Sequence, residues 1–169
     1  MKRRAWLAAG TLAPWLTLAQ PTARAQPPET RPVVEWPPIQ LLDGRTLNPS
    51  SWHGRAAVVV FWSTDCAFCT RHNAHIHKLH RATQGQALRV LGVALDTDAQ
   101  AVRQYMARNR YAFPVTLDGG SLRQRLTTRR VVPMTCVLDQ QGRLLQAIPG
   151  EMAEDDVLGL ARGLQGARA

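Results

Sequence analysis

A long apolar run followed at once by two cysteines constrains this chain more than any other feature. Residues 56–62 read AAVVVFW, and their length and β-branched and aromatic content predict a buried central strand. Cys66 and Cys69 follow, and apolar residues then recur at helical spacing from Phe68 to about Thr83. The sequence therefore predicts a strand, a short turn that carries the cysteine pair, and a helix that begins at the pair.

The position of the pair predicts redox chemistry. A cysteine at a helix N-terminus faces unpaired backbone N–H groups, which stabilise the reactive thiolate form. The two-residue spacing lets the second cysteine attack a mixed disulfide on the first and release the product. Cys66 is thus the predicted nucleophile and Cys69 the predicted resolving thiol. Half of a zinc site is the alternative, but no second cysteine or histidine pair follows at zinc-finger spacing.

The rest of the chain alternates between strand and helix patterns. A hairpin is expected around Asp43-Gly44. Further strands are expected at 88–95, 115–117, 134–139 and 143–148, and further helices at 98–110, 121–126 and 151–164. This alternation predicts one α/β domain with a largely parallel centre and an antiparallel hairpin at one edge of the sheet.

Residues 1–25 have the pattern of an export signal. A basic start, Lys2-Arg3-Arg4, precedes an apolar stretch, and Ala23-Arg24-Ala25 is a small-x-small cleavage site. The adjacent arginines also fit a twin-arginine signal, so either export route stays open. Residues 26–38 are rich in proline and predict an extended lead-in, which places the folded domain at 39–166. We therefore expect a periplasmic protein with a cleaved signal peptide, in a compartment where disulfides persist.

Composition and charge exclude several classes of protein. Hydrophobic residues make up 45% and charged residues 20% of the chain, which is globular rather than disordered composition. The formal net charge is +9, but the arginines are scattered rather than gathered in a stripe with aromatic residues, so no nucleic-acid partner is expected. The adjacent pair Arg129-Arg130 either lies in a solvated loop or attracts an acidic partner.

A proline directly before a predicted central strand is a second candidate feature. Pro133 is either a cis-proline in a tight turn that faces the cysteines or an ordinary loop proline. In the first case the backbone of Val132 would be offered to an extended peptide. Val132, Trp62 and Phe68 are the candidate substrate contacts.

Together these motifs resemble those of the thioredoxin-fold family, in its exported TlpA/ResA/CcmG-like branch of thiol-disulfide oxidoreductases. The resemblance runs from about Ile39 to Leu164 and is carried by the segments LLDGRTL, VVVFWSTDCAFC, VLGVALDTDAQAV, FPVTLD and VVPMTCVLDQQGRLL. It implies a central mixed sheet flanked by helices, an N-terminal β-hairpin and an inserted strand and helix. It also implies that Cys66 attacks, Cys69 resolves and Pro133 is a cis-proline beside the site.

The resemblance further implies a protein-disulfide reductase that needs no bound cofactor. Its substrates would be cysteine pairs of exported proteins, of the cytochrome c maturation or copper-site type, and a membrane thiol-reducing donor would recharge it. We expect a monomer. The alternative is a Sco-like copper carrier that uses Cys66, Cys69 and a histidine, although the two-residue spacing tells against it. No metal site is assigned to the four histidines of the cysteine helix, because they lie on different sides of it.

Two residues near the cysteines depart from the family pattern. Asp65 stands where the family usually has tryptophan; its carboxylate opposes thiolate formation but could cap the helix. His72 stands where this branch often has a buried glutamate. It is either a proton shuttle to Cys69 or a core histidine hydrogen-bonded to backbone. Cys136, within an apolar strand, is expected to pack as a small buried hydrophobe.

Overall fold

The computed structural model describes residues 33–166, and its regular elements run from Ile39 to Gly166. The predicted export signal, residues 1–25, and residues 26–32 of the proline-rich lead-in lie outside the described residues. Within the described range, no helix combines the length and the apolar character that crossing a membrane requires.

A five-stranded mixed sheet forms the centre of the domain, with the strand order β5-β4-β3-β6-β7. β3 pairs with β4 in parallel and with β6 in antiparallel orientation, and β6 and β7 form the antiparallel hairpin at one edge. The predicted parallel centre and antiparallel edge are therefore confirmed. The strands are β3 (Ala56–Trp62), β4 (Leu88–Ala94), β5 (Val115–Thr116), β6 (Met134–Leu138) and β7 (Leu144–Pro149).

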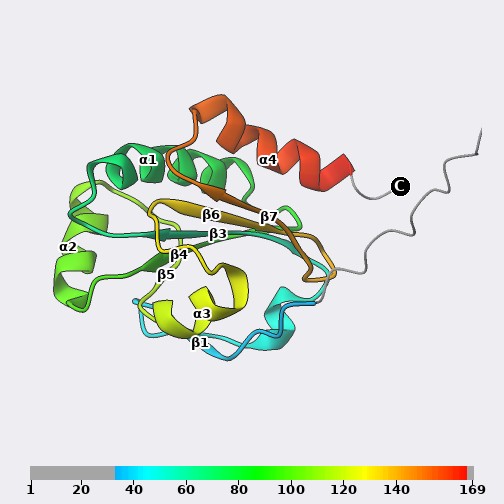
Figure 1. The fold of residues 1–169 in the computed structure, drawn as a ribbon, viewed down its shortest axis with the longest axis horizontal. Coiled ribbons are helices and arrows are strands. Elements are labelled where there is room, and N and C mark those ends of the chain that lie inside the picture. The colour runs from blue at the N-terminus through cyan, green and yellow to red at the C-terminus, as the bar shows by residue number, and fades with distance from the viewer. Residues whose placement is uncertain (1–32, 167–169) are drawn as a thin grey trace, which may run out of the picture.

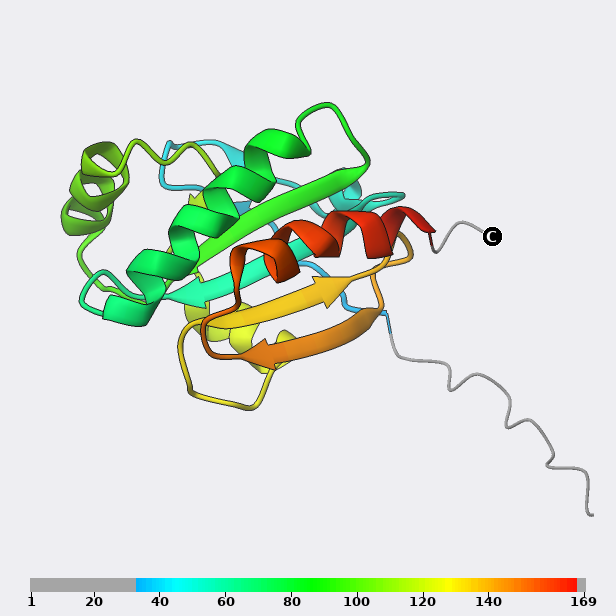
Figure 2. The ribbon, with the colours of Figure 1, turned by 90° about the horizontal axis from the view of Figure 1, so that it is seen from above.

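Helices cover both faces of this sheet. Figure 1 shows α1 and α4 on one face and α3 on the other, with α2 at the end of the molecule beside β4 and β5. Seen from above, α1 and α4 run side by side over the strands (Figure 2). The helices are α1 (Ala67–Ala82), α2 (Ala99–Arg108), α3 (Gly119–Leu126) and α4 (Glu154–Gly166).

The predicted N-terminal hairpin is present and closes one edge of the sheet. β1 (Ile39–Gln40) pairs antiparallel with β2 (Thr46–Leu47), and a short 3-10 helix, η1 (Pro49–Trp52), follows. The turn between the strands needs the left-handed backbone of Gly44, at φ 87°. Leu41, just after β1, bridges to Thr116 of β5. The hairpin segment thus pairs with what would otherwise be an open strand edge.

The position of β3 in the centre of the sheet explains why its sequence is apolar at every position. All of its side chains are buried, because helices cover both faces of the sheet. Val60 and Trp62 pack into the cluster formed with α1, α2 and α4, whereas Val59 and Phe61 pack into the cluster on the side of α3. Each such side chain contributes about 1.5–3 kcal/mol when fully buried. This two-sided packing fixes the end of β3, where the cysteine pair begins.

The last helix begins later than its sequence pattern predicts, at Glu154 rather than at Glu151. The carboxylate of Glu151 accepts two parallel hydrogen bonds from Arg71 of α1, at 2.8 and 2.6 Å. The peptide N–H of Met152 donates to His72 of the same helix at 3.3 Å. These contacts hold residues 151 and 152 against α1 in non-helical backbone, so the helix starts beyond them.

Candidate active site

Cys66 lies at the N-terminus of α1, as predicted. It is the N-cap residue, with φ −91° and ψ 111°, and its side chain is half-buried. The peptide N–H of Cys69 donates to the Cys66 sulfur at 3.2 Å. The sulfur thus accepts a backbone hydrogen bond at the end of the helix where peptide N–H groups are unpaired.

Cys69 has a different environment one helical turn further on. Its side chain is fully buried. Burial, with a contribution from the hydrogen bond to Cys66, raises the pKa of the Cys69 thiol to about 12. Cys69 is therefore protonated at neutral pH, and Cys66 is the cysteine of the pair that a partner can reach.

The Val132-Pro133 peptide bond is cis, which confirms that prediction. The register pairs Phe61 of β3 with Met134 of β6, so the turn before β6 lies at the end of β3 from which the cysteine motif departs. Val132 and Cys66 are both half-buried and pack against the same apolar cluster. The structure thus brings Pro133 to the same end of the sheet as Cys66 and Cys69, although it follows them by more than sixty positions in the sequence.

The turn between β3 and α1 is fixed by two aspartates. The Ser63 hydroxyl donates to the carboxylate of Asp65 at 2.7 Å. The Thr64 peptide N–H and hydroxyl both donate to the carboxylate of Asp96, just after β4. Asp65 does not cap the helix, because Cys66 takes the capping position and Asp65 lies one residue before it. The sequence analysis did not identify Asp96 as a site residue. Its position just after a parallel strand could have placed it at this end of the sheet.

His72 is fully buried between α1, β6 and the segment that precedes α4. Its Nε2 lies 2.9 Å from the hydroxyl oxygen of Thr135 in β6, and its Nδ1 accepts the peptide N–H of Met152 at 3.3 Å. Because Nδ1 accepts, the hydrogen-bond network assigns the proton to Nε2, which donates to Thr135. Burial, assisted by the nearby His75, lowers the pKa of His72 to about 4, so the ring is neutral at pH 7.

These contacts bear on the two interpretations of His72. Both ring nitrogens are engaged, and among the hydrogen bonds of residues 33–166 none joins His72 to Cys69. A proton transfer from the thiol would therefore require one of the two bonds to break first. The role of a proton shuttle stays a prediction, while the buried, hydrogen-bonded histidine is what the structure contains.

Two of the predicted substrate contacts have unexpected positions. Trp62 is fully buried against Tyr105, with ring centroids 4.9 Å apart, so it cannot touch a substrate and that prediction is wrong. Phe68, expected on the apolar face of α1, is 59% exposed, with the Arg71 guanidinium 5.0 Å from its ring centroid. The buried stripe of α1 runs through Cys69 and its helical neighbours, and Phe68 lies beyond its edge. Phe68 is thus available to a partner beside Cys66.

The remaining cysteine and the histidines are placed away from the pair. Cys136 is buried on the α3 side of the sheet, where its thiol lies 3.8 Å from the carbonyl oxygen of Leu126, and burial raises its pKa to about 12. His75 contacts the carbonyl of Met152, and His77 accepts the peptide N–H of Ala112. In the part of the chain that the structure describes, no group of three His, Cys, Asp or Glu side chains is placed to hold a metal ion.

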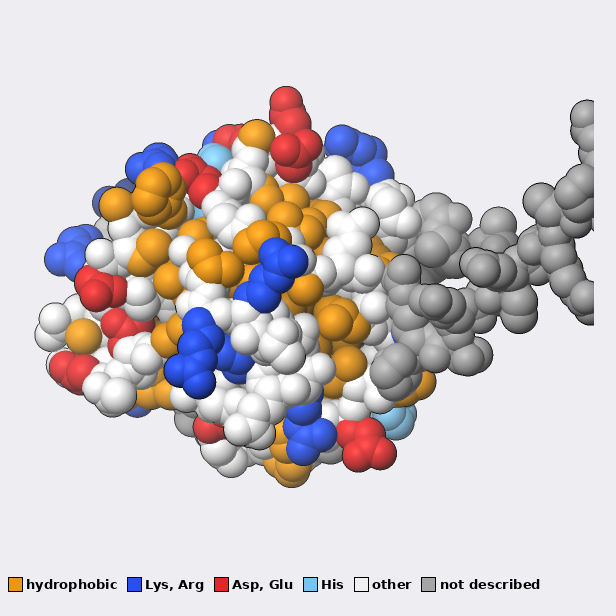
Figure 3. Space-filling view, in the orientation of Figure 1, with side chains coloured by type: hydrophobic (Ala, Val, Ile, Leu, Met, Phe, Trp, Pro, Cys, Tyr) orange, Lys and Arg blue, Asp and Glu red, His pale blue; other side chains and the backbone are white. Residues whose placement is uncertain are grey.

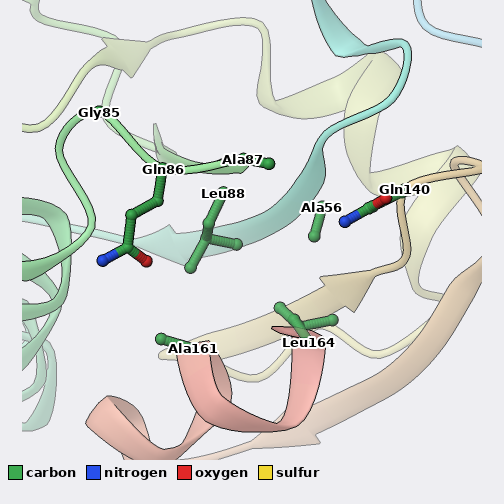
Figure 4. Close-up of a pocket in the computed structure, with 8 residues that line it drawn as sticks. All are labelled: Ala56, Gly85, Gln86, Ala87, Leu88, Gln140, Ala161 and Leu164. Atoms are coloured by element: carbon green, nitrogen blue, oxygen red, sulfur yellow. The ribbon is translucent and has the colours of Figure 1, made fainter. Parts of the chain in front are cut away.

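A pocket of about 520 Å³ lies at the other end of the sheet. Figure 4 shows α4 side chains facing the first residues of β3 and β4 across it. Cys66 follows the last residue of β3, so this pocket is not part of the site around the cysteines. Its lining consists of Ala56, Gly85, Gln86, Ala87, Leu88, Gln140, Ala161 and Leu164.

Comparison with known families decides the wider classification. The family model described as Redoxin matches residues 18–162. The chain belongs to the Redoxin family. Among curated proteins, it is similar to the thiol-disulfide oxidoreductase ResA of Halalkalibacterium halodurans, with 24% identity over 119 residues that cover 70% of this chain and 68% of that protein. The predicted resemblance to the ResA-like branch is thereby confirmed.

Solved structures confirm the thioredoxin-like fold. StoA from Bacillus subtilis superimposes with a TM-score of 0.66 at 18% identity, covering 77% of this chain and 99% of StoA. A secreted disulfide oxidoreductase of Mycobacterium tuberculosis, described as homologous to the DsbE of E. coli, gives 0.67 at 20% identity, covering 78% of this chain and 97% of that one. At these identities the likeness establishes the fold, and the chemistry must be argued from the site.

Proposed function

We propose that this Redoxin-family protein exchanges disulfides with other proteins, with Cys66 as nucleophile and Cys69 as resolving thiol. The observation that carries the proposal is the contrast within the pair. The Cys66 sulfur is accessible and accepts a backbone N–H at the start of α1, whereas Cys69 is buried with its pKa raised to about 12. Such an asymmetric pair attacks with one sulfur and protects the other until a mixed disulfide has formed.

Reduction of a substrate disulfide takes two exchange steps. The Cys66 thiolate attacks a substrate disulfide, the substrate S–S bond breaks, and one substrate sulfur leaves as a thiolate that takes up a proton. Cys69 then loses its proton and attacks the Cys66 sulfur of the mixed disulfide, which releases the second substrate thiolate. The products are a Cys66–Cys69 disulfide and a substrate dithiol, so two electrons have passed to the substrate. No bound cofactor takes part in these steps.

Substrate contacts in this proposal come from both sides of Cys66. The backbone of Val132, before the cis-proline, lies beside the same apolar cluster as Cys66 and suits pairing with an extended peptide. The exposed ring of Phe68 lies two residues after the nucleophile. We also propose that His72, three residues after Cys69, takes up the proton of the resolving thiol.

We propose that the protein works in the reducing direction and in the periplasm. We infer a reductase of cysteine pairs in exported proteins, of the cytochrome c maturation or copper-site type, that acts as a periplasmic monomer and is recharged by a membrane thiol-reducing donor. The signal-like residues 1–25 support export, as does the secreted state of the mycobacterial relative. The similarity to ResA supports the reductase branch.

The first test is the reduction potential of the pair, measured by thiol trapping of residues 26–169 in dithiol and glutathione buffers. A potential of about −270 mV, as in thioredoxin, supports a reductase. A potential of about −120 mV identifies a disulfide donor and refutes the proposed direction. A Cys136→Ala background keeps the third thiol out of the titration.

The second test separates exchange chemistry from copper transport. In the Cys136→Ala background, Cys69→Ala should accumulate a mixed disulfide with a purified disulfide-bonded substrate such as insulin, and Cys66→Ala should not. The copper-carrier alternative requires a third ligand, yet both nitrogens of His72 are already hydrogen-bonded. Failure to form the mixed disulfide, together with stoichiometric Cu(I) binding by the unsubstituted protein, would replace our proposal with that alternative.

A further inference from the structure

The segment that leads to the cis-proline is strongly basic. From Gly119 to Leu138 the sequence contains four arginines and no aspartate or glutamate. Two of the arginines lie on α3 and two on the loop that follows it, and we refer to the four as the arginine surface: Arg123, Arg125, Arg129 and Arg130. Figure 3 shows Lys and Arg side chains over α3 and its surroundings, interleaved with hydrophobic side chains.

The arginine surface has no acidic partner within the described protein. The ion pairs found among residues 33–166 involve other cations, on α1, in the β1–β2 turn and in the β6–β7 turn. The Nε and Nη2 atoms of Arg123 are buried without a hydrogen-bond acceptor. Its guanidinium lies 5.4 Å from the ring centroid of Phe61, and burial and the nearby Arg130 lower its pKa. Two like charges without counter-ions form a site that an external carboxylate would stabilise.

This surface borders the proposed redox site. Arg129 and Arg130 are exposed and precede Val132, which packs against the same apolar cluster as Cys66. Val131, between the arginines and the cis-proline turn, is 44% exposed. The only other large hydrophobic side chains exposed to this degree among residues 33–166 are Phe68, beside Cys66, and Val33. Cationic and apolar groups therefore lie together in the loop that leads to the cis-proline turn.

We propose that the arginine surface binds an acidic segment of the protein substrate, next to the cysteine pair that is being reduced. This inference rests on the proposed function and specifies its substrate class: a cysteine-containing chain with Asp or Glu within a few residues of the target disulfide. Arg side chains suit this task because they present a planar fork of donors to a carboxylate. Exposed complementary charges mainly accelerate encounter, so the preference should appear in the association rate and weaken with salt.

The experiment compares cyclic disulfide peptides that differ only in four flanking residues, which are Glu, Gln or Lys. Reduction by the pre-reduced protein is quenched with acid and quantified by mass spectrometry, which gives a second-order rate constant. At low ionic strength the Glu peptide should react about tenfold faster than the Gln peptide, and about 0.5 M salt should remove most of this difference. The Lys peptide should be the slowest.

Two matched double variants locate the effect. Arg129→Gln with Arg130→Gln should lose most of the preference for the Glu peptide while it reduces the Gln peptide at the unsubstituted rate. Arg108→Gln with Arg162→Gln removes the same charge from exposed positions on α2 and α4 and should keep the preference. The unchanged rate on the Gln peptide shows that the fold and the cysteine pair are intact.

Other outcomes overturn the inference in distinguishable ways. Equal rates for the three peptides, or a preference that survives in the Arg129/Arg130 variant, refute the acidic substrate and leave the proposed function standing. Failure of the unsubstituted protein to reduce any peptide refutes both. Binding to phosphatidylglycerol vesicles that requires Arg129 and Arg130, without any peptide preference, would identify the surface as a lipid contact instead.

Discussion

The buried ring of His72 should make the stability of this protein depend on pH. The pKa of His72 is about 4 in the folded protein, against 6.5 for the free side chain. Between these values the unfolded chain takes up a proton that the folded protein excludes. The stabilisation of the folded protein by neutral His72 is therefore fully present above pH 6.5 and is lost as pH falls towards 4. Protonation linkage over this interval amounts to about 2–3 kcal/mol of unfolding free energy between pH 7 and pH 4.5.

His72→Gln tests this reasoning, because glutamine does not titrate. Urea unfolding of the reduced protein at pH 7 and pH 4.5 gives the loss of unfolding free energy for each variant. The loss in His72→Gln should be smaller than in the unsubstituted protein by about 2–3 kcal/mol. His53→Gln, at an exposed position, should lose as much as the unsubstituted protein. An equal loss in His72→Gln would mean that the imidazole is not held neutral, and the argument would fail.

Three further predictions concern other buried positions. Thr135→Val leaves Nε2–H of His72 without its acceptor and should lower the free energy of unfolding by about 1–3 kcal/mol in urea, whereas Thr135→Ser should cost less; equal costs would refute this account of the bond. Gly92→Ala would place a Cβ 2.8 Å from the ring of Phe113, and the overpacking should cost about 1–3 kcal/mol, visible as a lower Tm. Cys136→Ala should keep the rate of disulfide exchange, and a native thiol titration should not detect Cys136; rapid labelling of Cys136 would contradict its burial.

Local sequence patterns were sufficient to predict the elements that present the cysteines. β3 and α1 are each specified by residues that are neighbours in the chain, through an apolar run of strand length and a helical repeat. The prediction of Trp62 as a substrate contact failed, because its side chain is fully buried. A strand covered by helices on both faces buries its side chains alternately on each side, so closeness in sequence to Cys66 says nothing about exposure.

The partners of the site residues could not be predicted in this way, because they come from distant parts of the chain. His72 contacts Thr135, 63 positions away, and the backbone of Met152, 80 positions away. The carboxylate of Asp96 reaches back 32 positions to Thr64. A single sequence identifies each polar group but not the group opposite it, since that depends on the packing of α1 against β6 and the start of α4.

Residues 150–152 connect the cis-proline turn to the helix that carries the cysteines, although none of them has a reactive side chain. The peptide N–H of Gly150 donates to the carbonyl of Pro133 at 2.8 Å, and two residues later the N–H of Met152 donates to His72. Between them, the carboxylate of Glu151 binds Arg71 of α1. The segment therefore joins the cis-proline turn to the helix that carries both cysteines. Because it is fixed by backbone hydrogen bonds at either end, the relative position of Cys66 and the substrate-facing turn depends on residues 150–152 as well as on the cysteine motif.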